Sequence, residues 1–281
     1  MSIVTKLRPP GPDHETVTGQ MAQGRLITCW GSSGGGKTSV SVNLSFELAS
    51  LGKKVLLVDL DSYHPSIAAL LGLVDAGPGI TAVLRLGRAG RLNVDELDRL
   101  SQEVIFGKQS LKVITGMNAP TRWPELERSG LSELFSFAKN NFDFTVLDIA
   151  GELEEGLFSQ VSSVPRNFAS SEAIQSADLA LGIFASDQVG VNRFLVDMQG
   201  AGFEFWPIAN RVRASVLGRN PERQLRDALF RSAQLRVRAT IPEDGAAMDA
   251  AQQRAQPLLM AAKSSKTREA IRQLALEIAD L

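Results

Sequence analysis

The stretch that decides the fold is WGSSGGGKTS, residues 30–39, in which small residues run into a lysine and a hydroxyl. Within it, residues 31–38 match the pattern G-x-x-x-x-G-K-[ST]. Glycines let successive backbone N–H groups turn inward around an anion. Lys37 brings a point charge to the phosphates, and Thr38 offers a hydroxyl to Mg²⁺. The pattern predicts a phosphate-binding loop, and a flexible linker is the alternative.

The neighbouring segments favour the phosphate-binding loop over the linker. RLITCW (25–30) is typical of a short buried strand, and KTSVSVNLSFELASLG (37–52) is typical of a helix closed by Gly52. That helix would present its positive N-terminus to the same phosphates. KKVLLVDLD (53–61) then reads as a second apolar strand that ends in carboxylates.

The remaining chain continues this alternation of short apolar strands and helical stretches. Residues 66–140 are mostly helical in pattern, with breaks at 77–79 and one strand candidate, LKVITG (111–116). Four later strands are expected in FDFTVLDIAG (142–151), ADLALGIFAS (177–186), FEFWPIANRV (203–212) and LRVRATIPED (235–244). We therefore expect a polar tail over 1–24 and one doubly wound α/β domain over 25–281, with a mainly parallel sheet covered on both sides.

The last helical stretch carries an apolar stripe. Ile271, Leu274, Ile278 and Leu281 fall on one helical face. A basic amphipathic helix would suit a membrane surface, but the charges near the end of this chain are acidic. We therefore expect the stripe to pack in the core.

Three aspartates follow apolar runs, where the carboxyl ends of parallel strands meet. Asp148 ends one run, and Asp59 and Asp61 end another with the i, i+2 spacing that puts both on one face of a strand. Mg²⁺ prefers oxygen ligands, and ligands of such sheets bind at this edge. The alternative is that one of the three caps a helix or pairs with a lysine.

Composition excludes several classes of protein. The net charge is -1, so the chain is not a polycation built for nucleic acid. Its one cysteine, Cys29, cannot form a disulfide or a cysteine-based metal site within the chain. No apolar run is long enough to span a bilayer. These features favour a cytoplasmic protein.

These segments together resemble the MinD/ParA group of P-loop ATPases over about residues 25–281. The resemblance lies in residues 31–72, in FDFTVLDIAG, and in ANRV (209–212) and IPED (241–244). LKVITGMNAPTRWPEL (111–126) is more similar to the CpaE/TadZ branch. The resemblance implies an ATPase that positions pilus, secretion or division machinery, recruited to a cell pole or the inner membrane by a protein partner.

The resemblance also implies roles for individual residues, with ATP or ADP and Mg²⁺ as cofactors. Lys37 and Asp61 would be catalytic, with Asp61 orienting the attacking water, and Thr38, Asp59 and Asp148 would surround the metal. The nucleotide-binding set would be Gly31, Ser32, Ser33, Gly34, Gly35, Gly36, Lys37, Thr38, Ser39, Asn210, Arg211, Ile241 and Pro242. Asn210 would read adenine through its amide, with Ile241 and Pro242 along the base. An asparagine after a strand is also a common turn former.

One departure from the family pattern concerns the loop itself. Ser32 stands where the group usually carries a second lysine, which reaches across an ATP-linked homodimer to the partner's phosphates, and Ser33 replaces the next glycine. A serine brings no positive charge to the transferred phosphoryl group. We expect nucleotide binding to survive and hydrolysis to be slow or to need an arginine from elsewhere. A nucleotide-dependent scaffold with little hydrolysis and a small-molecule kinase remain alternatives.

Residues 211–238 form a basic stretch. It holds eight arginines against Glu222 and Asp227, a net charge of +6. Non-specific contact with DNA phosphates, as in ParA-type partitioning ATPases, is one interpretation. A solvated surface or an interface with an acidic partner is the interpretation we favour, because lysine runs and interleaved aromatic residues are missing.

Overall fold

A computed structural model describes residues 23–73, 77, 79–151, 165–199 and 201–281. The described residues form an eight-stranded sheet of order β3-β4-β2-β5-β1-β6-β7-β8, parallel except for β3 against β4. The strands are β1 (Arg25–Trp30), β2 (Val55–Leu60), β3 (Gln102–Phe106), β4 (Gln109–Ile114), β5 (Phe144–Ile149), β6 (Leu179–Ala185), β7 (Trp206–Val212) and β8 (Ala239–Pro242). Most of the expected tail, residues 1–22, lies outside the described residues.

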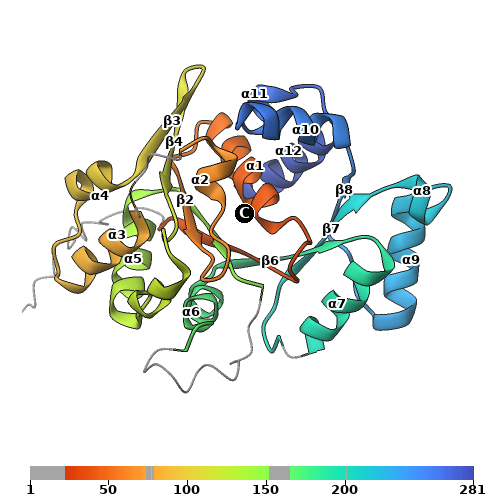
Figure 1. The fold of residues 1–281 in the computed structure, drawn as a ribbon. Coiled ribbons are helices and arrows are strands. Elements are labelled where there is room, and N and C mark those ends of the chain that lie inside the picture. Colours follow the sequence, from red (N-terminus) through yellow and green to blue (C-terminus); the bar gives the residue numbers. More distant parts are fainter. Residues whose placement is uncertain (1–22, 74–76, 78, 152–164, 200) are drawn as a thin grey trace, which may run out of the picture.

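Helices cover both faces of the sheet (Figure 1). One face carries α1 (Lys37–Ser50), α2 (Ile67–Leu70), α10 (Gly245–Arg254), α11 (Leu258–Ala261) and α12 (Lys266–Ala279). The other carries α3 (Gly79–Arg88), α4 (Val94–Leu100), α5 (Arg128–Asn141), α6 (Phe168–Ser176), α7 (Gln188–Gln199) and α9 (Pro221–Ala233). A 3₁₀ helix (Pro120–Glu125) precedes α5, and α8 (Ala214–Leu217) follows β7. The predicted doubly wound α/β fold is confirmed.

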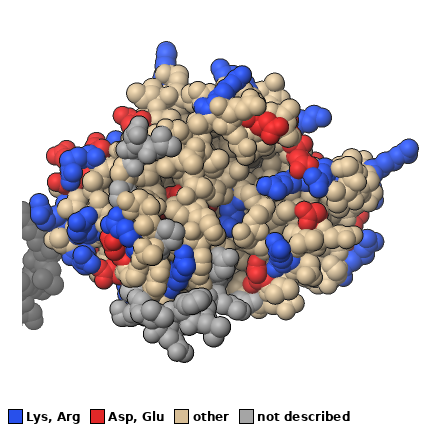
Figure 2. Space-filling view, viewed as in Figure 1, with Lys and Arg blue, Asp and Glu red and all other residues tan. Residues whose placement is uncertain are grey.

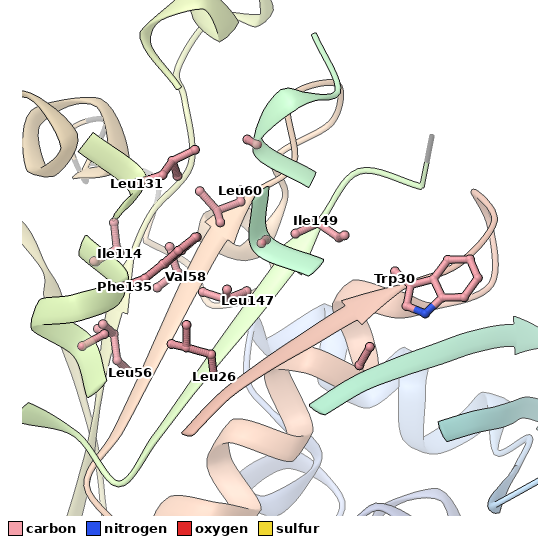
Figure 3. Close-up of a cluster of buried hydrophobic side chains, with 14 of the residues drawn as sticks. Leu26, Trp30, Leu56, Val58, Leu60, Ile114, Leu131, Phe135, Leu147 and Ile149 are labelled. Carbon is pink, nitrogen blue, oxygen red and sulfur yellow. The ribbon is translucent and has the colours of Figure 1, made fainter. Parts of the chain in front are cut away.

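Alternate residues of the central strands pack in two separate cores, one on each face of the sheet. On the α5 side, Leu56, Val58 and Leu147 are fully buried and lie near Leu131 and Phe135 of α5 (Figure 3). Strand residues that point to the other face, Ile27, Leu57 and Val146, belong to the second core. That core also contains Leu44 and Leu48 of α1 and Leu274 of α12. Strands buried on both faces read as continuous apolar runs, which is why the sequence predicts them well.

Two features of the fold differ from the expectations. The sequence does not predict β3, because its run QEVIF has exposed and half-buried residues before one buried residue, Phe106, and Ile105 is 69% exposed. Leu281 lies beyond the end of α12 and is 53% exposed, so it does not join the buried stripe of Ile271, Leu274 and Ile278. The core packing of those three residues is confirmed. Among the described helices, none is long and apolar enough to cross a membrane.

Candidate nucleotide-binding site

The glycine loop joins the end of β1 to the start of α1. Gly31 has φ 124, and a Cβ there would lie 2.2 Å from the carbonyl oxygen of Ile183. Gly36 precedes the first residue of α1 with φ 89, and a Cβ there would lie 2.3 Å from the side-chain nitrogen of Asn210. These positions need glycine because side chains rarely adopt such a backbone and neighbouring atoms occupy the space. The backbone of the loop therefore depends on glycine at Gly31 and Gly36.

Lys37 and the end of β5 face each other across this loop. Lys37 is only 8% exposed. A Cβ built on Gly151 would lie 2.7 Å from the oxygen of Gly31, and 3.2 Å from both Lys37 Nζ and the amide nitrogen of Ser33. A side chain at Gly151 would fill the space beside the lysine, so glycine keeps that space open.

Asp148 sits at the carboxyl end of β5, fully buried and in register with Asp59 of β2 and Cys29 of β1. Its Oδ1 accepts a 2.9 Å hydrogen bond from Ser41 Oγ, and its Oδ2 is buried without a partner among the described residues. Burial raises the pKa of Asp148 to about 6, although the hydroxyls of Thr38 and Ser41 and the charge of Lys37 pull it down. An unsatisfied buried carboxylate oxygen beside a hydroxyl suits a hard cation.

A metal at this point would need oxygen atoms from outside the protein as well. The described residues contain no cluster of three or more His, Cys, Asp or Glu that could hold a metal ion. Mg²⁺ is usually held by one or two carboxylates, waters and substrate phosphates, so this donor set fits a Mg²⁺–nucleotide complex. Asp148 and Thr38, whose hydroxyl acts on the Asp148 carboxyl, would hold it.

Asp59 is already bonded to the backbone on both oxygens. Oδ1 accepts from the amide of Asp61 at 3.2 Å, and Oδ2 accepts from Ser66 at 2.9 Å and Ile67 at 3.0 Å. Burial and the charge of Asp148 raise its pKa well above the usual range, against the effect of these donors. Both oxygens of Asp59 therefore accept backbone N–H groups. Those that bond to Oδ2 lie at the start of α2, an arrangement that resembles the alternative in which one of the three aspartates caps a helix.

Asp61 orders the loop after β2. Its Oδ1 accepts hydrogen bonds from the amides of Tyr63 at 2.8 Å and His64 at 2.9 Å. Arg166 closes over this loop: its guanidinium lies 3.8 Å from the centre of the Tyr63 ring and donates to the oxygen of Ser62 at 3.0 Å. Sequence reasoning missed Arg166, because it lies about 100 residues away and no local pattern marks it.

A cavity of about 190 Å³ adjoins the end of the loop and the start of α1. Five of its lining residues belong to the predicted nucleotide-binding set: Gly36, Ser39, Asn210, Arg211 and Pro242. Arg211 adopts φ 56. Ile241 is 0% exposed and belongs to the core, so it does not line this cavity. Sequence reasoning missed further lining residues from α10 and α12, namely Met248, Gln252, Thr267 and Ile271.

The amide of Asn210 is engaged with the loop. Nδ2 donates to the oxygen of Gly35 at 2.9 Å, and Oδ1 accepts from the amide of Arg211 at 2.9 Å. Asn210 therefore joins the end of β7 to the glycine loop at the mouth of the cavity. The rest of the loop edge, Ser32–Gly35, borders a separate cavity, and Ser32 Oγ donates to Asp197 of α7.

The nucleotide-binding domain family described as CobQ/CobB/MinD/ParA matches residues 26–258. The chain belongs to this family. An iron-sulfur cluster carrier protein of Aquifex aeolicus is 29% identical over 152 residues, covering 52% of this chain and 35% of that protein. The antiactivator FleN of Pseudomonas aeruginosa is 28% identical over 147 residues, covering 51% of this chain and 49% of FleN. The chain thus spans less than half the length of these two relatives.

Solved structures of MinD/ParA proteins share this fold over 90% of the chain. A ParA family ATPase from Chlorobium tepidum TLS superimposes with a TM-score of 0.72 at 18% identity, covering 90% of this chain and 98% of that one. MinD from Pyrococcus horikoshii OT3, solved as a complex with Mg-ADP, gives a TM-score of 0.67 at 22% identity, covering 90% and 95%. The prediction of a MinD/ParA superfamily P-loop ATPase is confirmed.

The likeness to an iron-sulfur carrier does not extend to cysteine ligands in this chain. Cys29 is its one cysteine, fully buried in β1. Burial raises the pKa of the thiol to about 12, which opposes the thiolate form that a cluster would require.

Proposed function

We propose that this chain binds ATP with Mg²⁺, hydrolyses it slowly and uses the nucleotide state to control where a protein partner assembles. The observation that carries the proposal is the convergence on one glycine loop of Lys37, the unsatisfied Oδ2 of Asp148 and the cavity bordered by Asn210. The membership in the MinD/ParA family and the Mg-ADP complex of a structural neighbour support the same cofactor.

The proposed division of labour follows from these contacts. The loop amides and Lys37 hold the phosphates, because N–H groups and a buried cation both favour an anion there. Thr38 and Asp148 hold Mg²⁺, which when bound would neutralise charge on the phosphates. Asp59 shapes the adjoining turn through its backbone bonds and adds negative charge near the metal. Asn210 and Pro242 border the base.

Asp61 is the proposed water-positioning residue. In the described structure its Oδ1 accepts two amides of the loop after β2, and a second oxygen remains for a water molecule. The order of that loop, held by Asp61 and Arg166, is the feature that a partner or a second copy of the chain would recognise. We propose a pilus, secretion or division assembly as the process served, on the resemblance of residues 111–126 to the CpaE/TadZ branch.

The test compares ATP binding and phosphate release for the wild-type chain, Asp61→Ala and the control Asp249→Ala, an exposed acid on α10. We expect Asp61→Ala to bind ATP but release phosphate at least about 100-fold more slowly, and Asp249→Ala to match the wild type. Unchanged turnover in Asp61→Ala would show that the water-positioning role is wrong.

A scaffold that binds ATP without turning it over is the second candidate. It is favoured by the absence of any Lys or Arg between Trp30 and Gly36, which leaves Lys37 as the one cation of the loop. Tight ATP binding with negligible phosphate release, with a partner present, would support the scaffold. Measuring the oligomeric state with and without Mg-ATP would show whether a second copy of the chain binds in response to the nucleotide.

A further inference from the structure

A second cavity, of about 480 Å³, borders the glycine loop at Ser32–Gly35. Its other walls come from the end of β6, the first turns of α7, the end of β7 and the chain after β7. Three arginines line it: Arg193, Arg211 and Arg213. Its one lining carboxylate among the described residues is Asp187, whose Oδ1 caps α7 by accepting from the amide of Gly190 at 2.8 Å. The cavity therefore brings surplus positive charge against the backbone of the loop.

The three arginines are not equivalent. Arg213 is paired with Glu243 at 2.7 Å. Arg211 lines both this cavity and the one at Asn210, so it is not specific to either. Arg193 lines this cavity only, is exposed, and forms no salt bridge with the described part of the chain. Its guanidinium is thus available to an incoming anion.

The loop is joined to the helix that carries Arg193. Ser32 Oγ donates to Asp197, which lies one turn after Arg193 on α7. Beside it the loop edge is open, because a Cβ on Gly34 would meet no atom within 4 Å. Among residues 30–39 only Lys37 carries positive charge. A triphosphate bound here would therefore find additional cations among the arginines that line this cavity rather than on the loop.

We propose that Arg193 binds the terminal phosphate of the bound nucleoside triphosphate from this cavity and supplies the charge that Ser32 does not. The inference rests on the proposed function. Arg193 would be the side chain through which the same site distinguishes ATP from ADP. A planar guanidinium matches phosphate oxygens, and a charge-assisted contact is stronger than one from a neutral serine. Because ADP lacks that phosphate, losing Arg193 should weaken ATP binding selectively.

The experiment titrates the full chain with Mg-ATP and with Mg-ADP and measures phosphate release. We expect Arg193→Ala to weaken ATP binding about tenfold and to slow turnover, with ADP affinity changed by less than about twofold. Arg193→Lys should keep most of the ATP preference. Arg219→Ala is the matched control, because Arg219 is exposed and lines neither cavity; it should behave like the wild type. Adding Ser32→Lys to Arg193→Ala should recover the ATP preference.

The outcomes separate this inference from the proposed function. An unchanged ratio of ATP to ADP affinity in Arg193→Ala, or an equal loss of both, overturns the role of Arg193 and leaves nucleotide binding standing. Failure of the wild-type chain to bind either nucleotide overturns both. Circular dichroism of each variant checks that the exposed substitution leaves the fold intact.

Discussion

At the residue scale, the site depends on two buried carboxylates held side by side. Asp59 and Asp148 end neighbouring parallel strands in register, and each is at most 1% exposed. Burial disfavours their charged forms, and the pair raises the pKa of Asp59 further by mutual repulsion. The nucleotide-free chain therefore stores unfavourable electrostatic energy at the point where a cation would relieve it.

This arrangement predicts a pH dependence for the nucleotide-free chain. The pKa of Asp148 is about 6 in the folded chain, above its ordinary 3.8. Such a carboxyl favours the folded state at low pH, and this contribution is lost as pH rises through 6. An asparagine side chain at this position cannot ionise. The free energy of unfolding of Asp148→Asn, relative to that of the wild type, should therefore rise by up to about 3 kcal/mol between pH 4 and pH 7.5.

The measurement is urea unfolding at both pH values with a chelator present. Asp249→Asn, at an exposed position, is the control and should shift equally at both pH values. A difference between Asp148→Asn and the wild type that does not change with pH would mean that Asp148 is ionised freely in the folded chain.

The contacts of Asn210 predict a second effect at this scale. Its amide bonds Gly35 of the loop and the backbone of Arg211 beside the cavity. Asn210→Ala should therefore weaken ATP binding by about tenfold and reduce the preference for ATP over GTP. Competition titrations with the two nucleotides would check this. An intact preference with an intact ATP affinity would place base recognition elsewhere.

At the element scale, α12 is a packed helix rather than an interfacial one. Leu274 is 2% exposed and lies in the same core as α1 and β8, whereas Leu281, beyond the helix, is 53% exposed. Leu274→Ala should lower the free energy of unfolding by about 2–5 kcal/mol. Leu281→Ala should change it by less than about 0.5 kcal/mol. Equal effects in urea unfolding would contradict the packing of this helix.

Sequence reasoning predicted the elements that carry strong local patterns and missed those decided by contacts across the fold. Val55–Leu60 and Phe144–Ile149 are fully buried strands, so their apolar runs identify them and their terminal aspartates. The hairpin of β3 and β4 lies at the sheet edge, where exposed residues weaken that signal. The bonds of Asp59 to Ser66 and Ile67, and the place of Arg193 beside the loop, depend on packing that no short pattern encodes.

At the scale of the whole molecule, the chain is close to neutral, with a net charge of -1. On the face shown in Figure 2, basic and acidic side chains are interspersed among the described residues. Several arginines of the 211–238 stretch have partners within the chain: Arg213 with Glu243, Arg223 with Asp227, Arg226 with the oxygen of Val237, and Arg238 with Glu277. This pairing supports the interpretation of a solvated surface or partner interface over DNA contact.

Filter binding with duplex DNA should therefore show little retention at physiological salt. Retention that falls steeply as salt rises, and that Arg219→Ala and Arg231→Ala reduce, would instead assign the stretch to DNA phosphates. Both arginines are exposed, and neither forms a salt bridge with the described residues.

The central claim is that the glycine loop holds the phosphates of ATP around Lys37. Calorimetric titration of Mg-ATP into the wild-type chain and into Lys37→Ala tests it most directly, with urea unfolding to show that both chains are folded. We predict binding in the micromolar range for the wild type and a loss of at least about 100-fold for Lys37→Ala, because a buried cation is removed from the phosphates. Equal affinity in the two folded chains, or no binding by the wild type, would contradict the account.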